Sequence, residues 1–315
     1  MNYKSLDLCY YPRGATIITE NGNAWFGLNY PNQFQSNSKV RTQWKDFLQL
    51  GVDVFFGSCI PKSPNQPSID HFQKKYSNEF STNFLIPFFR GVFLDPSCEK
   101  SSNQFQYYLH NFFKGGAAIP KYGMKEIPAQ LAKQIPSDCI ELNANVTALY
   151  NNQLIINNTS HEFKHIILAT DLSTTYNLID QPLPINPWLK VHNFILAKKS
   201  PTTLAPLTLV SKASPISHFN IPTLVSDALA PPGTHYMNVT TFEHCDPKKI
   251  ETEIHELTNE RDWAFVWHDT IKKALPRYQL TPQISSPYVS LCGDWTTHRP
   301  SIEGALYSGT HVKRH

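Results

Sequence analysis

The residues best suited to chemistry lie near the C-terminal end, within residues 288–309. Gly293 closes an apolar run, and a glycine at the end of a buried strand lets the backbone approach a ligand closely. Asp294 follows directly, and its carboxylate can accept hydrogen bonds from sugar-type hydroxyl groups. Ser301 then suits the N-cap of a helix whose first N–H groups can face an anion or an electron-rich ring. The pattern predicts either a cofactor cradle or an ordinary strand-to-helix junction with a capping serine.

Two buried strands are expected to position this segment. Residues 288–293 and 164–170 are nearly continuous apolar runs, as is usual for strands covered on both faces. Residues 139–146 alternate apolar and polar side chains and predict another strand, with a further one at 153–157. The helix after Ser301 has one small side, against which a flat group can lie, formed by Gly304, Ala305 and Gly309.

The rest of the chain predicts a mixture of helices and short strands. Residues 15–19 with the turn residues Asn21 and Gly22 predict a hairpin, and residues 178–236 predict a sheet with long connections. Asp246 and Pro247 predict the start of a helix, with a further helical stretch over 264–275 that Pro276 ends. Other predicted segments are helices at 40–50, 102–113 and 125–134, a core-packing segment at 84–94 and a loop at 58–67.

Residues 291–309 contain Cys-Gly-Asp-Trp, then Pro-Ser-Ile-Glu-Gly-Ala, then Ser-Gly. This string resembles the C-terminal FAD motif of the flavin-containing amine oxidases and of their protoporphyrinogen oxidase and phytoene desaturase relatives. The resemblance implies that Asp294 binds the ribityl or pyrophosphate part of FAD and that Gly293 precedes it at the cofactor. It also implies that the helix beneath the flavin starts with the residues Ser301, Ile302, Glu303, Gly304 and Ala305.

The resemblance extends into the middle of the chain. Residues 142–146 are similar to a strand whose valine, here Val146, lies against the adenine end through its backbone, and residues 166–170 are similar to a strand ending beside the cofactor at Thr170. The implied fold class is α/β, with an FAD/NAD(P)-binding, Rossmann-like domain interleaved with a substrate domain of mixed β-sheet plus helix. The expected FAD-binding domain comprises residues 115–175 and 283–315, and the expected substrate domain comprises residues 1–114 and 176–282.

One part of the family pattern is missing from these residues. The family has a strand–Gly-x-Gly-x-x-Gly–helix unit that cradles the FAD pyrophosphate. The chain has 13 glycines, and no two of them are separated by a single residue. Two hypotheses follow. The protein is an FAD-dependent oxidoreductase that transfers hydride from a small organic substrate to the flavin N5, or it is a non-catalytic truncated remnant, or one half of a split flavoenzyme that needs its N-terminal FAD-binding portion.

Composition excludes several other classes of function. The net charge of +3 argues against nucleic acid as the main partner, because phosphate binding needs a concentrated basic face. Neither a membrane span nor a signal peptide is expected from the sequence, so we expect a cytoplasmic protein. We also expect its substrate to be a small molecule. The histidines are scattered without zinc-ligand spacing, so no metal site is expected and no catalytic residue is assigned. A homo-oligomer, or a second chain carrying the missing portion, are the open alternatives for partners.

Overall fold

The computed structural model describes residues 3–27, 44–56, 67–280, 282–284, 286–297 and 300–312. The chain divides into two compact units, which we call unit 1 (Met1–Lys133 with Lys190–Ile271) and unit 2 (Gln134–Leu189 with Lys272–His315). These boundaries differ from those predicted from the sequence at 114, 175 and 282. The assignment of the two units to a substrate and an FAD-binding domain stays a prediction.

Unit 1 is built on a mixed sheet that has seven strands in the described part of the chain, in the order β13-β9-β12-β11-β10-β2-β3. Strand β10 pairs with β2 in parallel, whereas β9–β12, β12–β11, β11–β10 and β2–β3 are antiparallel. The strands are β2 (Gly14–Thr19), β3 (Gly22–Gly27), β9 (Trp188–Lys198), β10 (Leu207–Val210), β11 (Ile216–Asn220), β12 (His235–Thr241) and β13 (Ala264–Pro276).

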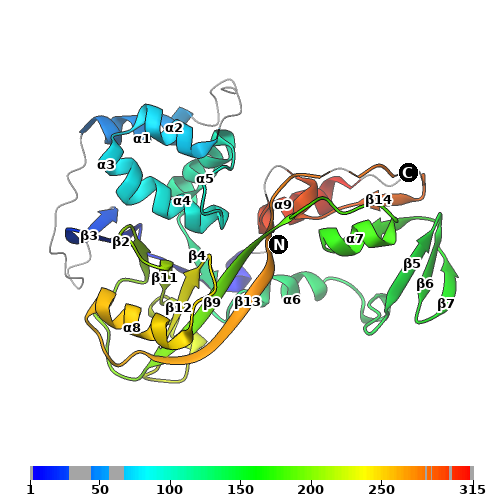
Figure 1. Ribbon diagram of the computed structural model, residues 1–315. Helices are drawn as coiled ribbons and strands as arrows, with labels where there is room; N and C mark the ends of the chain where they lie inside the picture. The colour runs from blue at the N-terminus through cyan, green and yellow to red at the C-terminus, as the bar shows by residue number, and fades with distance from the viewer. Residues whose placement is uncertain are drawn as a thin grey trace. The chain divides into compact units, whose positions relative to one another are not determined.

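Helices cover both faces of this sheet (Figure 1). Successive strand residues point to opposite faces, so Ile17 joins the core beneath α1–α5, whereas Ile18 joins the core beneath α8. The helices are α1 (Trp44–Phe56), α2 (Ser68–Lys75), α3 (Asn78–Phe80), a π-helical turn (Ser81–Leu85), α4 (Ile86–Phe93), α5 (Ser102–Gly115), α6 (Glu126–Ala132) and α8 (Pro247–Thr258). Smaller elements of unit 1 are β1 (Leu8–Tyr10), which pairs with β4 (Ala118–Pro120), and 3₁₀ turns at Tyr3–Leu6, Pro222–Leu224 and Asp227–Leu229.

Unit 2 contains two small sheets in its described residues. Strands β5 (Val146–Tyr150), β6 (Gln153–Ile156) and β7 (Thr159–Glu162) form an antiparallel sheet, and β8 (Ile166–Leu168) pairs with β14 (Val289–Leu291) in parallel. The remaining elements are α7 (Leu172–Leu178), α9 (Ile302–His311) and the 3₁₀ turns Ser137–Cys139 and Asp294–Thr296. Its main core consists of Ile166, Leu168, Leu178 and Val289.

Local signals explain several helix ends. The Ser101 hydroxyl accepts a hydrogen bond from the Gln104 N–H at the start of α5, and Gly116 ends that helix with a φ of +74°. Asp246 caps α8, with Pro247 as its first residue. The sequence predictions of these two helices and of the 15–19 hairpin are confirmed. Strands also form within the apolar runs 164–170 and 288–293, but they are short (Ile166–Leu168 and Val289–Leu291), and Ile167 is 37% exposed, so β8 is not covered on both faces as predicted. Residues 28–43 and 57–66, which include Val40 and most of the predicted 58–67 loop, lie outside the described part.

Two predictions of secondary structure are wrong. Residues 264–275 form most of strand β13 instead of a helix, because pairing with β9 satisfies the backbone and overrides the helical spacing of the apolar side chains. Residues 139–145 do not form a strand: Ile140 and Leu142 are exposed, and Asn143 has a φ of +59°. The strand begins at Val146, where the predicted one ends. No helix in the described ranges is long and apolar enough to cross a membrane.

Candidate active site

The candidate site lies in unit 2, at the ends of the parallel strands β8 and β14. The strands are in register, with Leu168 opposite Leu291, and the Cys292 N–H continues the ladder by donating to the Leu168 carbonyl at 3.0 Å. Parallel strands end at the same edge of a sheet, and this edge is where ligands bind in open α/β folds. Thr170 and Gly293 therefore leave the sheet from the same edge.

A buried tryptophan joins the two strand ends. Trp295 is 1% exposed, and its indole N–H donates to the Thr170 carbonyl at 3.2 Å. Gly293 has a φ of +154°, and a Cβ at this position would lie 2.6 Å from the Trp295 Nε1. The glycine is thus required by the close packing of the indole and by a backbone conformation that other residues rarely adopt.

Helix α9 is fixed to the same edge by two serines. The Ser301 hydroxyl accepts the Gly304 N–H at 3.1 Å and caps the helix, as the sequence predicts. The Ser308 hydroxyl accepts the Gly293 N–H at 2.8 Å and donates to the Ala305 carbonyl at 2.9 Å. Sequence reasoning missed Ser308, although its place one turn after Gly304 on the small side of the helix is the signal that would have found it.

Asp294 provides the charge of the site. Its side chain is half-buried, and burial raises the pKa of the carboxyl above its ordinary value, while the backbone N–H groups of Trp295 and of Asp294 itself act in the opposite direction. A carboxylate held in this way accepts further hydrogen bonds readily, because each new donor offsets the cost of its desolvation.

The other residues predicted for the site do not all lie at this edge of the sheet. Ile302, Glu303 and Ala305 form the exposed first turn of α9, and Gly304 is buried. Val146 opens β5 in the other sheet and packs against the core that contains Ile166 and Val289. The structure therefore brings together Thr170, Gly293, Asp294 and the start of α9, whereas Val146 pairs with Ile156 of β6 and packs against the core of unit 2.

A cavity of about 380 Å³ adjoins β14 and α9 within unit 2. Strand β14 forms one wall and the second half of α9 forms another, with Tyr307 and His311 stacked upon each other at a ring separation of 4.0 Å. Thr296 and Thr297 close it beside the Asp294 turn. This open pocket provides space for part of a small ligand beside β14 and α9.

Comparison with known proteins identifies the family. The model of the flavin-containing amine oxidoreductases matches residues 23–198, which is more than half of the chain. The protein belongs to the flavin-containing amine oxidoreductase family. The matched stretch includes residues 142–146 and 166–170, which resemble the family in sequence, and ends before residues 291–309. No curated protein matches the sequence significantly.

Solved structures share the amine oxidoreductase fold. An oxidoreductase from Methanosarcina mazei is 15% identical with a TM-score of 0.71, covering 96% of this chain and 81% of its own. Cyclohexylamine oxidase from Brevibacterium oxydans is 12% identical with a TM-score of 0.66, covering 97% and 81%. A reduced UDP-galactopyranose mutase is 14% identical with a TM-score of 0.60, covering 93% and 75%. The α/β fold class expected from the sequence is thereby confirmed.

The family indicates FAD as the cofactor, and the described residues fit one end of it. The half-buried Asp294 carboxylate and the capped, exposed first turn of α9 suit the hydroxyl-bearing and electron-rich parts of a flavin. The pyrophosphate has no such match, because the 315 residues contain no Gly-x-Gly and the Gly293 N–H is bonded to Ser308.

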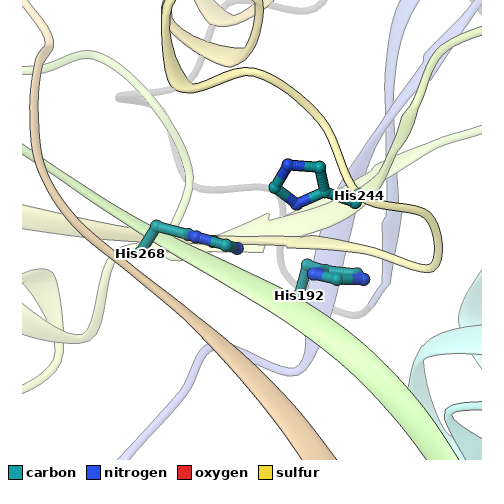
Figure 2. A group of neighbouring side chains, drawn as sticks. All are labelled: His192, His244 and His268. Carbon is teal, nitrogen blue, oxygen red and sulfur yellow. The ribbon is translucent and has the colours of Figure 1, made fainter.

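A second group of chemically competent side chains lies in unit 1 and was not expected from the sequence. His192 of β9, His244 after β12 and His268 of β13 lie side by side (Figure 2). Only the pairing order β13-β9-β12 brings these three segments together, so no local spacing in the sequence signals the cluster.

Proposed function

We propose that this amine oxidoreductase family member is an FAD-dependent oxidoreductase acting on a small organic substrate, with unit 2 holding the flavin and ribityl end of the cofactor. The convergence of Thr170, Gly293, Asp294 and the α9 N-terminus at one sheet edge supports the proposal. The flavin, when bound, supplies the acceptor for hydride at N5. The protein's own part is to bind, orient and exclude water.

Each residue has a distinct part in this proposal. Asp294 accepts hydrogen bonds from ribityl hydroxyl groups, and its half-buried position makes each of them worth more than in water. The first turn of α9, Ile302–Glu303 with Ala305, presents the positive end of the helix dipole to the flavin. Thr170 holds the Trp295 indole in place through its carbonyl, and the backbone of Val146 contacts the adenine end.

FAD titration of Asp294→Ala tests the proposal. Losing a charged hydrogen-bond acceptor costs about 1.5–3 kcal/mol, so the Kd for FAD should rise by about 10- to 100-fold. Binding is followed by flavin absorbance between about 350 and 500 nm and by quenching of flavin fluorescence. Asp138→Ala is the matched control, because Asp138 is exposed in the same unit. An Asp294→Ala variant with wild-type FAD affinity contradicts the assignment.

A second candidate function rests on the missing glycine motif. With no Gly-x-Gly in the sequence and the Gly293 N–H already bonded, we propose as the alternative a non-catalytic remnant, or a partner subunit of a split flavoenzyme that needs an N-terminal FAD-binding portion. A wild-type chain that takes up no FAD alone, but does so with an added chain carrying strand–Gly-x-Gly-x-x-Gly–helix, favours the split enzyme. Uptake of FAD by the isolated chain favours the first proposal.

A further inference from the structure

The three histidines of unit 1 converge from different strands upon one point. Each offers one imidazole nitrogen, and these nitrogens all lie within 4.8 Å of one another. The His192 and His268 rings are nearly parallel, with a separation of 5.7 Å and an angle of 14°. The His244 ring is inclined to both, at 5.4 Å and 62° from His192 and at 5.5 Å and 56° from His268. Figure 2 shows the side chains of the two strands lying beneath that of the loop residue His244.

Two imidazole nitrogens of this cluster are buried without a hydrogen-bond partner among the described residues. The His192 Nδ1 pairs with the Thr270 hydroxyl at 3.0 Å, and this contact leaves the His192 Nε2 buried and unpaired. The His268 Nε2 is also buried and has no hydrogen-bond partner among the described residues. A buried polar atom without a partner destabilises a protein, so two of them in one cluster indicate a missing ligand.

The cluster has a feature that is typical of metal-binding histidines, which bind through the neutral imidazole. The hydroxyl of Thr270 fixes the His192 ring, in the way that outer hydrogen bonds orient metal-binding histidines.

One side of the histidine cluster packs on a buried aromatic ring, and the other side is open to solvent. The His268 ring stacks on Phe194 at a separation of 4.4 Å and an angle of 23°, and Phe194 is fully buried in the core beneath α8. His192 is 3% exposed, whereas His244 is exposed at the surface. An ion can therefore enter from the His244 side and meet two ligands that are already held in place.

We propose that His192, His244 and His268 bind one divalent transition-metal ion of the zinc class, with water at the remaining position. Three imidazoles and one open position form a common tetrahedral zinc arrangement, with Zn–N distances of about 2.0–2.1 Å. Such a geometry needs nitrogens about 3.3 Å apart, so binding an ion requires the side chains to move inward from separations of up to 4.8 Å. The bound ion ties β9 and β13 to the loop after β12, independently of the flavin site.

Metal uptake by the full chain tests this site without reference to any activity. The chelator-stripped protein is titrated with Zn²⁺ alone in competition with a chromophoric chelator, and separately with Co²⁺, whose visible spectrum reports its coordination number. We expect one equivalent of Zn²⁺ bound with micromolar or tighter affinity and strong four-coordinate Co²⁺ bands. A wild-type protein that binds neither ion at stoichiometric level overturns the proposal.

Two single variants separate a designed site from adventitious binding. His244→Ala removes an exposed side chain, so the fold is retained, and His268→Ala removes a ligand from the sheet. Either change should weaken Zn²⁺ binding by about 100-fold or more, because loss of even an outer-sphere partner costs about 10- to 100-fold. His161→Ala, an exposed histidine on β7, is the matched control and should bind Zn²⁺ as the wild type does. Wild-type affinity in both cluster variants contradicts the site.

Discussion

The candidate flavin site of unit 2 and the three-histidine cluster of unit 1 are assembled from the chain in opposite ways. In unit 2 one stretch of sequence supplies the strand β14, the Gly293 turn and the start of α9, and Thr170 joins them from the end of β8. In unit 1 each histidine comes from a different segment, and the strand order alone unites them. A contiguous motif is visible in the letters of a sequence, whereas a convergent cluster exists only once the sheet topology is known.

The supports of the two sites also differ. The histidine cluster stands on a large core in which Phe194, Leu196, Met237 and Val239 are fully buried. Among the described residues of unit 2, the main core has four buried members, and every residue of strand β7 is exposed. Truncating a supporting side chain should therefore cost more stability beneath the histidines than at the flavin-side turn.

The largest loss of stability is expected from Phe194→Ala. This change leaves a cavity in the unit 1 core, and its expected cost is about 3–5 kcal/mol in the free energy of unfolding. It also removes the ring upon which His268 is stacked, so Zn²⁺ affinity should fall together with stability. Urea unfolding and hydrogen exchange of the β9 and β12 amides measure the first effect, and the chelator competition measures the second.

Phe194→Leu serves as the control, because it keeps most of the volume and should cost less than about 1.5 kcal/mol. If Phe194→Ala costs no more than the leucine variant, then the cluster does not stand on a tightly packed core, and the contrast between the two units is lost.

A smaller effect is expected from Gly293→Ala. The new Cβ would meet the Trp295 indole at 2.6 Å in a backbone with a φ of +154°, at an expected cost of about 2 kcal/mol. The displaced indole would loosen its hydrogen bond to the Thr170 carbonyl and weaken FAD binding, measured by the same titration as for Asp294→Ala.

Gly309→Ala is the matched control for this strain. Gly309 lies in the same helix α9 that Ser308 ties to Gly293, and a Cβ there meets no atom within 4 Å. Alanine is the better helix former by about 1 kcal/mol, so this variant should be as stable as the wild type or more stable. Equal destabilisation by both alanines would show that packing at the Gly293 turn has no special role.

The sequence predicted those features whose cause is local. Capping residues define both ends of α5 and the start of α9, and the apolar run of residues 164–170 identifies strand β8, because each signal acts within a few residues. Strand β13 could not be predicted locally, because its apolar residues have the spacing of a helix. Its strand conformation depends on pairing with β9. The histidine cluster could not be predicted for the same reason: His268 lies on that strand.

The smallest effect is expected from Lys273→Met in unit 2. The Lys273 ammonium pairs with the Asp171 carboxylate at 2.9 Å, and the two side chains are 47% and 40% exposed. Exposed ion pairs contribute about 0–1 kcal/mol, so the variant should lose no more than this at pH 7, and less in high salt. Methionine retains the apolar stem beside Trp188, over which the ammonium lies at 5.9 Å.

The pH dependence of unfolding shows whether the Lys273–Asp171 ion pair contributes to stability. Burial raises the pKa of the Asp171 carboxyl, but the hydrogen bonds from Lys273 and Thr174 outweigh it, and the pKa is held below its usual range. Because the native pKa is lower than the unfolded pKa of about 3.9, the ionised carboxylate stabilises the folded state above that pH. This contribution is lost as the pH falls through the native pKa. Wild type and Lys273→Met should therefore differ in urea unfolding at pH 7 and converge only once the pH has fallen below the lowered native pKa of Asp171, because a protonated carboxyl no longer attracts the ammonium. A difference that persists unchanged in acid would assign the effect of Lys273 to its stem and Trp188, and would leave unit 2 without a contribution from this charge pair.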